Sequence, residues 1–211
     1  ITHLVFMGMG EPLDNYPAVV KTCNLLTLPH AYNLSSKKVT VSTSGLVPKI
    51  ELLAKEAKVS LAVSLHAAND KLRTELMPIN RRYCLSKLKT ALLSYQKTTG
   101  DIITFEYILI ANKNVSLKEA KELVKFLHGL KAKVNLIPYN SHPGQDLQAP
   151  STTEMKVFQK YLADRSYPAP IRYSKGSAVS AACGQLAAKE KRQLNMAPSR
   201  LELMSKIKKE A

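Results

Sequence analysis

The chain has 211 residues, and its 31 lysines and arginines against 16 aspartates and glutamates give a formal net charge of +15 at pH 7. This length suits one substantial domain. No apolar run approaches the ~18 residues of a membrane span, and the first residues lack a signal-peptide pattern. We therefore predict a cytoplasmic protein without membrane attachment. A basic surface attracts polyanions such as RNA, although a solvated basic surface with no partner is the alternative.

The first part of the chain alternates between strand and helix patterns. Apolar periodicity predicts a strand at 4–6, a helix at 16–28, a strand at 38–42 and a helix at 48–57. A strand at 59–65 and a helix at 85–97 follow.

The alternation continues with a strand at 104–110, a helix at 116–127, a strand at 132–137, a helix at 152–162 and a short strand at 171–173. Ser116 followed by Glu119 forms a capping-box pattern, and Glu154 lies in the first turn of the last helix. Strict alternation predicts an α/β protein whose parallel strands are joined by crossover helices. The pattern fits an open doubly wound sheet and a barrel equally well.

Polar residues recur where the predicted strands end, at Glu11, Ser42, Ser64, His66 and Asn140. Ligands collect at the carboxyl edge of parallel sheets, so these groups are expected to converge on one mouth. A carboxylate there suits an amine, and hydroxyl and amide groups suit a carboxylate or a ribose. Each residue alone also has a plainer interpretation, such as a turn former at Ser42 or a helix-start histidine at His66.

The glycines of "MGMGEP", Gly8 and Gly10, leave the backbone open to close approach after the first strand, either by a ligand or in a tight turn. The three cysteines are too few and too scattered for a disulfide framework, and no CxxC pair indicates a zinc site, so we predict no metal site. Cys23 and Cys84 are interpreted as structural. Cys183 lies among small residues and is either an inert buried thiol or a nucleophile.

Together with "AACGQL", "VSTSG", "SLHAAND", "MPINRRY" and "NLIPYN", the strand ends resemble the RlmN/Cfr family of radical S-adenosylmethionine RNA methyltransferases. The resemblance runs from residue 4 to about residue 189. It implies a partial radical SAM (β/α) TIM-like barrel that uses S-adenosylmethionine.

Carried over position by position, the resemblance implies roles for eight residues. Gly10 and Glu11 would contact the amino group of S-adenosylmethionine, and the cofactor site would also be lined by Ser42, Ser64, Leu65, His66 and Asn140. Cys183 would be methylated first, and its methyl carbon would then be transferred as a radical to C2 of an adenine. The implied partners are 23S rRNA and/or tRNA and an external electron donor, with the protein as a monomer.

Two features depart from the family pattern. Ala178 stands about where the family has an acidic residue before the alanine pair. The CxxxCxxC motif that holds a [4Fe-4S] cluster is absent, and none of the three cysteines lies within four positions of another. Because the chain begins with Ile1, already inside a strand, we expect the cluster motif and a second catalytic cysteine on a preceding part of the full-length protein.

The sequence therefore predicts the C-terminal portion of an RlmN-type methyltransferase, with an incomplete barrel core at 1–188 and a basic tail at 189–211. The alternative is a truncated, catalytically silent RNA-binding remnant. An in-frame CxxxCxxC in the coding sequence upstream of Ile1 would favour the enzyme, whereas a start codon at Ile1 would favour the remnant. A Rossmann-like methyltransferase is disfavoured because Glu11 and Pro12, rather than a helix start, follow the glycines.

Overall fold

Five parallel strands form a sheet in the computed structural model, which describes residues 1–140 and 146–173. The strands are β1 (Leu4–Phe6), β2 (Val39–Thr43), β3 (Ser60–Ser64), β4 (Ile103–Leu109) and β5 (Ala132–Pro138). Each strand pairs with the next one in the sequence, in the order β1-β2-β3-β4-β5. A doubly wound sheet reverses its strand order at a switch point, so this consecutive order is that of a barrel wall.

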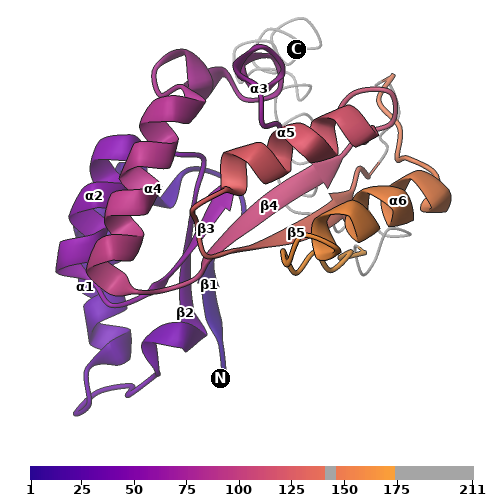
Figure 1. Cartoon of the computed structure of the whole chain (residues 1–211). Helices are drawn as coiled ribbons and strands as arrows, with labels where there is room; N and C mark the ends of the chain where they lie inside the picture. Colours follow the sequence, from indigo (N-terminus) through magenta and orange to yellow (C-terminus); the bar gives the residue numbers. More distant parts are fainter. Residues whose placement is uncertain (141–145, 174–211) are drawn as a thin grey trace, which may run out of the picture. The chain divides into compact units, whose positions relative to one another are not determined.

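Helices cross over between the strands and gather along one side of the sheet (Figure 1). They are α1 (Tyr16–Thr27), α2 (Val47–Glu56), α3 (Asp70–Leu76), α4 (Leu85–Thr99), α5 (Leu117–Leu127) and α6 (Thr152–Ala163), with short 3-10 turns η1 (Pro12–Asn15), η2 (Ser36–Lys38) and η3 (Pro78–Arg81). Consecutive crossovers of one hand place their helices on the same face. No helix in the described part of the chain is long and apolar enough to cross a membrane.

The two faces of the sheet differ sharply in chemistry. Alternate residues that face the helices are apolar and fully buried, among them Val41, Val63 and Phe105. Their neighbours on the other face include Ser42, Ser64, Glu106 and Asn135, so this face is polar. All-parallel sheets normally bury apolar side chains on both faces. The polar face is therefore typical of the inner wall of a barrel that holds a ligand.

The predicted strand at 171–173 is reduced to one parallel bridge between Leu136 and Ile171. The segment runs beside β5, where the Val134 N–H donates to the Pro168 carbonyl (2.8 Å) and the Leu136 N–H to the Pro170 carbonyl (3.0 Å). Proline has no N–H to donate, so Pro168 and Pro170 accept hydrogen bonds without returning any, which limits the ladder.

The remaining sequence predictions agree with the structure to within a few residues at each end. At α5, Ser116 caps the helix through the Lys118 N–H (3.2 Å) rather than through a reciprocal capping box. The full box forms at α6, between Ser151 and Glu154. The helix α3 is not among the elements predicted from the sequence; Asn69 caps it by accepting from the Leu72 N–H (2.8 Å).

We expect Tyr95→Phe to lower the free energy of unfolding by about 1–2 kcal/mol, because the buried Tyr95 hydroxyl donates to the Val59 carbonyl (2.8 Å) and its loss leaves that carbonyl unpaired. Urea unfolding followed by circular dichroism measures the change. Tyr161→Phe, at a partly buried position, is the control and should change stability less. An unchanged midpoint for Tyr95→Phe would contradict the expectation.

Candidate functional site

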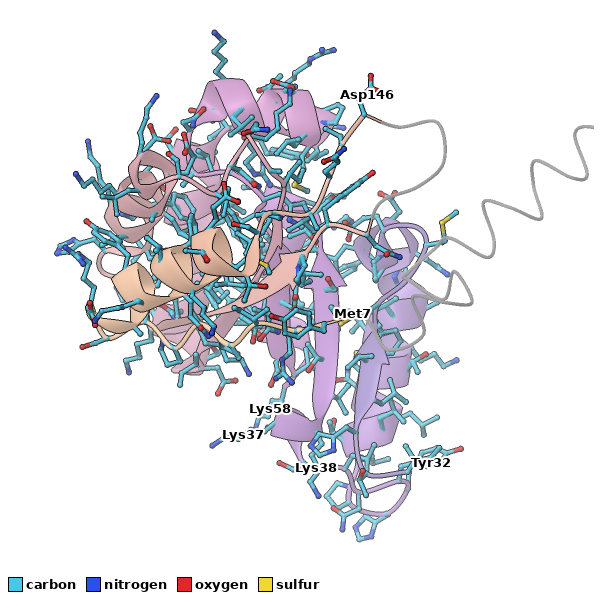
Figure 2. All side chains as sticks on the ribbon, turned by 90° about the vertical axis from the view of Figure 1, so that its right-hand side faces the viewer. Met7, Tyr32, Lys37, Lys38, Lys58 and Asp146 are labelled. Carbon is cyan, nitrogen blue, oxygen red and sulfur yellow. The ribbon has the colours of Figure 1, made fainter. Side chains whose placement is uncertain are left out.

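A hollow of about 280 Å³ opens where β1, β2 and β3 end at their carboxyl edge. It is lined by Phe6, Met7, Gly8, Gly10, Glu11, Pro12, Ser42, Thr43, Ser44 and Ser64. Figure 2 shows Met7 at this end of the strands, with Lys37, Lys38 and Lys58 at the opposite end. The fold thus brings together Gly10, Glu11, Ser42 and Ser64, four of the residues predicted from the sequence.

The two glycines after β1 form an open cradle. Gly8 has φ 141° and Gly10 has φ 90°, in the region that favours glycine. A Cβ atom placed on either glycine would meet no other atom within 4 Å, because both positions face open space. The backbone here is accessible to a ligand at close range.

Glu11 joins the loops that follow β1 and β2. Its Oε2 accepts hydrogen bonds from the Ser44 N–H (2.6 Å) and the Ser44 hydroxyl (2.8 Å), and its Oε1 accepts from the Leu13 N–H (3.0 Å). A carboxylate has about four acceptor positions, so three fixed donors orient the group and leave one position for a ligand donor such as an ammonium. Ser44 is not among the residues predicted from the sequence, although it lies in the motif "VSTSG".

Leu65 and His66 are held by β4. The Leu65 side chain is fully buried in the core and its N–H donates to the Glu106 carbonyl (3.0 Å), so only its backbone can face a ligand. His66 adopts φ 57°, and its Nδ1 accepts from the Ile108 N–H (3.1 Å). Burial, and then the charge of Arg73, lower the pKa of His66 to about 4. His66 is therefore neutral, with its proton on Nε2.

Asn140 lies beyond the end of β5, where the neighbouring Tyr139 N–H donates to the Leu109 carbonyl (2.9 Å). This places Asn140 at the carboxyl edge of the sheet, but not among the residues that line the hollow.

Cys183 and the predicted tail at 189–211 lie outside the described residues. Cys23 is buried, and burial raises its pKa to about 11, in keeping with a structural thiol.

The inner face of the sheet carries a further polar pair, Glu106 and Asn135, that was not predicted from the sequence. Glu106 is paired in register with Ser64 on one side and Asn135 on the other, and its Oε1 accepts from Asn135 Nδ2 (2.9 Å). Burial raises the pKa of Glu106 above its ordinary value. The sequence carries a signal for it, since Glu106 stands between the apolar residues Phe105 and Tyr107, and a carboxylate in mid-strand is unusual in an apolar sheet.

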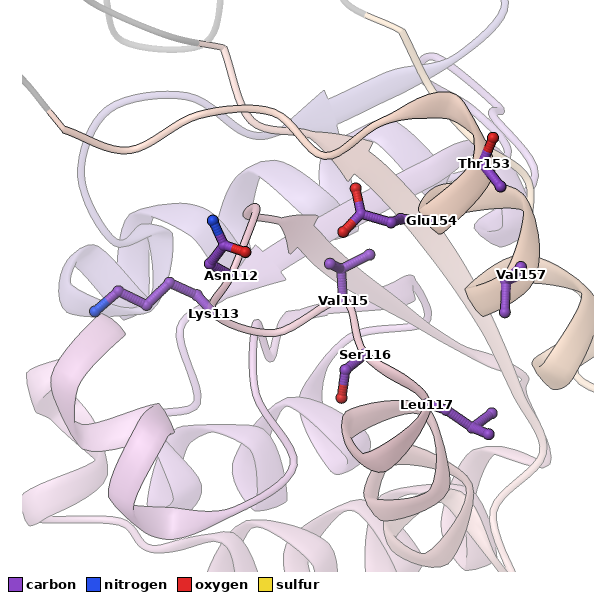
Figure 3. A pocket seen from close by; sticks show the side chains of 8 residues that line it. All are labelled: Asn112, Lys113, Val115, Ser116, Leu117, Thr153, Glu154 and Val157. Carbon is purple, nitrogen blue, oxygen red and sulfur yellow. The ribbon is translucent and has the colours of Figure 1, made fainter.

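A larger hollow of about 420 Å³ lies between the N-terminal ends of α5 and α6 (Figure 3). Its charged groups already have partners: Lys113 pairs with Glu75 (2.5 Å), and Glu154 belongs to the capping box of α6. The polar strand ends thus make the hollow beside Gly10 and Glu11 the better candidate site.

Comparison with known proteins decides the family. Residues 1–129 match the radical SAM superfamily. The chain belongs to the radical SAM superfamily. A radical SAM methyltransferase from Sphaerobacter thermophilus, known from a crystal structure, is similar at 47% identity and a TM-score of 0.83 over 88% of this chain and 55% of that one. A domain of a pyruvate-formate lyase-activating enzyme from Bacteroides vulgatus, at 17% identity and a TM-score of 0.62, shares the fold.

Two curated relatives are named dual-specificity RNA methyltransferase RlmN. The protein from Syntrophotalea carbinolica is 48% identical over 90% of this radical SAM chain and 51% of its own length. The protein from Syntrophobacter fumaroxidans is 47% identical over 89% of this chain and 55% of its own length. The chain therefore spans about half the length of the relatives that it matches.

The superfamily implies S-adenosylmethionine and a [4Fe-4S] cluster, and the residues of this chain fit only the first. The glycine cradle and the strand-end acceptors suit a ligand with an ammonium group and hydroxyl groups. The described ranges contain no group of three or more His, Cys, Asp or Glu that could hold a metal ion. The sequence has three cysteines and no CxxxCxxC, so its residues offer no ligand set for a cluster.

We expect stability to fall as the pH drops from about 6.5 to 4, because the unfolded chain protonates His66 before the folded chain does. A difference of about 2.5 pKa units corresponds to about 3 kcal/mol, which is fully present above pH 6.5. NMR titration of the imidazoles and urea unfolding at pH 7 and 4.5 measure the effect. His66→Gln should flatten the pH dependence, whereas His30→Gln, at an exposed site, should not. A His66 pKa near 6.5 would contradict the geometry.

Proposed function

We propose that this chain provides the S-adenosylmethionine site of an RlmN-type methyltransferase that acts on C2 of adenosine in 23S rRNA and/or tRNA. The observation that carries the proposal is the hollow at the carboxyl edge of β1–β3, which combines an open glycine cradle with Glu11, Ser42 and Ser64. The similarity at 47–48% identity to proteins named RlmN supports the choice of substrate class.

In this site the Glu11 carboxylate accepts from the ammonium group of the cofactor, since its other acceptor positions are held by Ser44 and Leu13. The Ser42 and Ser64 hydroxyls bind the polar edge of the ligand from the inner face of the sheet. When bound, S-adenosylmethionine supplies the methyl group and the radical chemistry of the superfamily.

The remaining assignments follow from the resemblance. Cys183 is the cysteine that carries the methyl group, and the backbone of Leu65, neutral His66 and Asn140 complete the cofactor site at the ends of β3 and β5. An external electron donor and RNA are the partners, and the protein acts as a monomer. The formal charge of +15 suits a partner rich in phosphate.

We expect Ser42→Leu to weaken binding of S-adenosylmethionine by at least about tenfold, because the added side chain fills the hollow that Ser42 lines. Equilibrium dialysis with labelled S-adenosylmethionine measures the affinity. Thr40→Leu is the matched control, since Thr40 lies on the same strand and face but not in the hollow, and it should bind like the wild type. Equal affinities for the two variants would contradict the proposed site, as would a wild-type chain that does not bind.

For RNA, we expect the logarithm of the affinity to fall with the logarithm of salt concentration by roughly 0.7 to 0.9 per neutralised phosphate. Filter binding of an RNA hairpin across a salt series measures this slope. Arg81→Glu with Arg82→Glu should lower both affinity and slope, because these exposed arginines lie in the segment that joins the carboxyl end of β3, where the site lies, to the start of α4. Lys37→Glu with Lys38→Glu makes the same charge change at the opposite end of the strands and should have a smaller effect. Salt-independent binding would argue against an RNA partner.

A further inference from the structure

Arg73 in α3 is the largest fully buried side chain among the described residues, and it is charged. Burial lowers the pKa of its guanidinium to about 10, which leaves it protonated at neutral pH. The ion pairs of the described part of the chain involve only lysines, so the buried charge is balanced by hydrogen bonds rather than by a directly paired carboxylate. Burying a cation in this way is energetically expensive, and its position needs a reason.

Its hydrogen bonds reach the ends of two strands. Arg73 Nη2 donates to the Ser44 carbonyl (2.8 Å), just after β2, and to the Ser64 carbonyl (3.3 Å), the last residue of β3. Ser44 and Ser64 both line the hollow, and Ser44 in turn donates to Glu11 after β1. One guanidinium thus connects the loops and strand ends that form three sides of the site.

Neighbouring residues fix the guanidinium in this place. Asn80 Oδ1 accepts from Arg73 Nη1 (2.9 Å), while Asn80 Nδ2 donates to Asp70 Oδ1 (2.9 Å) and to Thr74 Oγ1 (2.9 Å). A Cβ on Gly45, which has φ 111°, would lie 3.2 Å from Arg73 Nη2. These contacts give a common structural role to Ser44 and Gly45, to Asn80 and to the first turn of α3, none of which the cofactor assignments explain.

We propose that Arg73 is a positioning residue for the cofactor site: by binding the Ser44 and Ser64 carbonyls it holds the ends of β2 and β3 at the spacing that forms the hollow. The identity of the ligand rests on the proposed function, whereas the hydrogen bonds by which Arg73 holds the two strand ends do not depend on which ligand binds. Arg73 also acts on His66, whose protonation its charge opposes.

The test compares Arg73→Met, Arg73→Lys and the wild-type chain at a temperature where each is folded. Arg73→Met should weaken binding of S-adenosylmethionine by at least about tenfold. Arg73→Lys should weaken it by less, because an ammonium keeps the charge but has no second nitrogen to bind Asn80 Oδ1 while the first binds the Ser44 and Ser64 carbonyls. Tyr95→Phe is the control: it removes a buried hydrogen bond at the other end of β3 and should leave the affinity unchanged. Arg73→Met that is folded and binds like the wild type would overturn the proposal.

Two readouts do not depend on the ligand. Amide hydrogen exchange at Ser44, whose N–H binds Glu11, should accelerate in Arg73→Met and not in Tyr95→Phe. The pKa of His66 should rise in Arg73→Met and stay low in Arg73→Lys. If the wild-type chain does not bind S-adenosylmethionine, the proposed function fails, and unchanged exchange at Ser44 would then overturn the role of Arg73 independently. If Arg73→Met does not fold, Arg73→Lys decides by the same exchange and binding measurements.

Discussion

The parallel pairing of consecutive strands is the constraint on which the rest of the structure depends. Because β1 to β5 pair in sequence order, all five carboxyl ends meet along one edge and the crossover helices share one side. The helices cover an apolar face, and the other face is free to carry Ser42, Ser64 and Glu106. A polar inner wall and a ligand-binding edge are thus two results of the same strand order.

Strand ends are the least restrained part of such a sheet, and in this protein polar side chains connect them. Glu11 links the end of β1 to Ser44, Arg73 links Ser44 to Ser64, and His66 accepts from Ile108 on β4. These hydrogen bonds are partly buried, so losing a partner would leave a polar group that water satisfies only in part. The site is shaped by this series of contacts rather than by apolar packing alone.

The hydrogen bonds between the strand ends also determine which side chains can take part in chemistry. Glu11 keeps one acceptor position, whereas the His66 Nδ1 is already used and its pKa of about 4 leaves the ring neutral. Cys23 is buried with a raised pKa. In the proposed function, the strand-end residues of the described part of the chain bind and orient the ligand, and the methyl carrier is Cys183, outside that part.

The sequence alone determined the order of the five strands and of all the long helices, and most of the polar residues at the strand ends, because apolar periodicity and glycine positions are local signals; it did not reveal α3 or the role of Ser44. The resemblance in "MGMGEP" and "SLHAAND" pointed to a radical SAM barrel, which the strand order and the superfamily match confirm. Only the tertiary structure could reveal that Arg73 is buried and bonded to Ser44 and Ser64, since these residues are 29 and 9 positions away in the sequence. An arginine in a short helix has no local signal for burial. That state depends on strands and loops that only folding brings together.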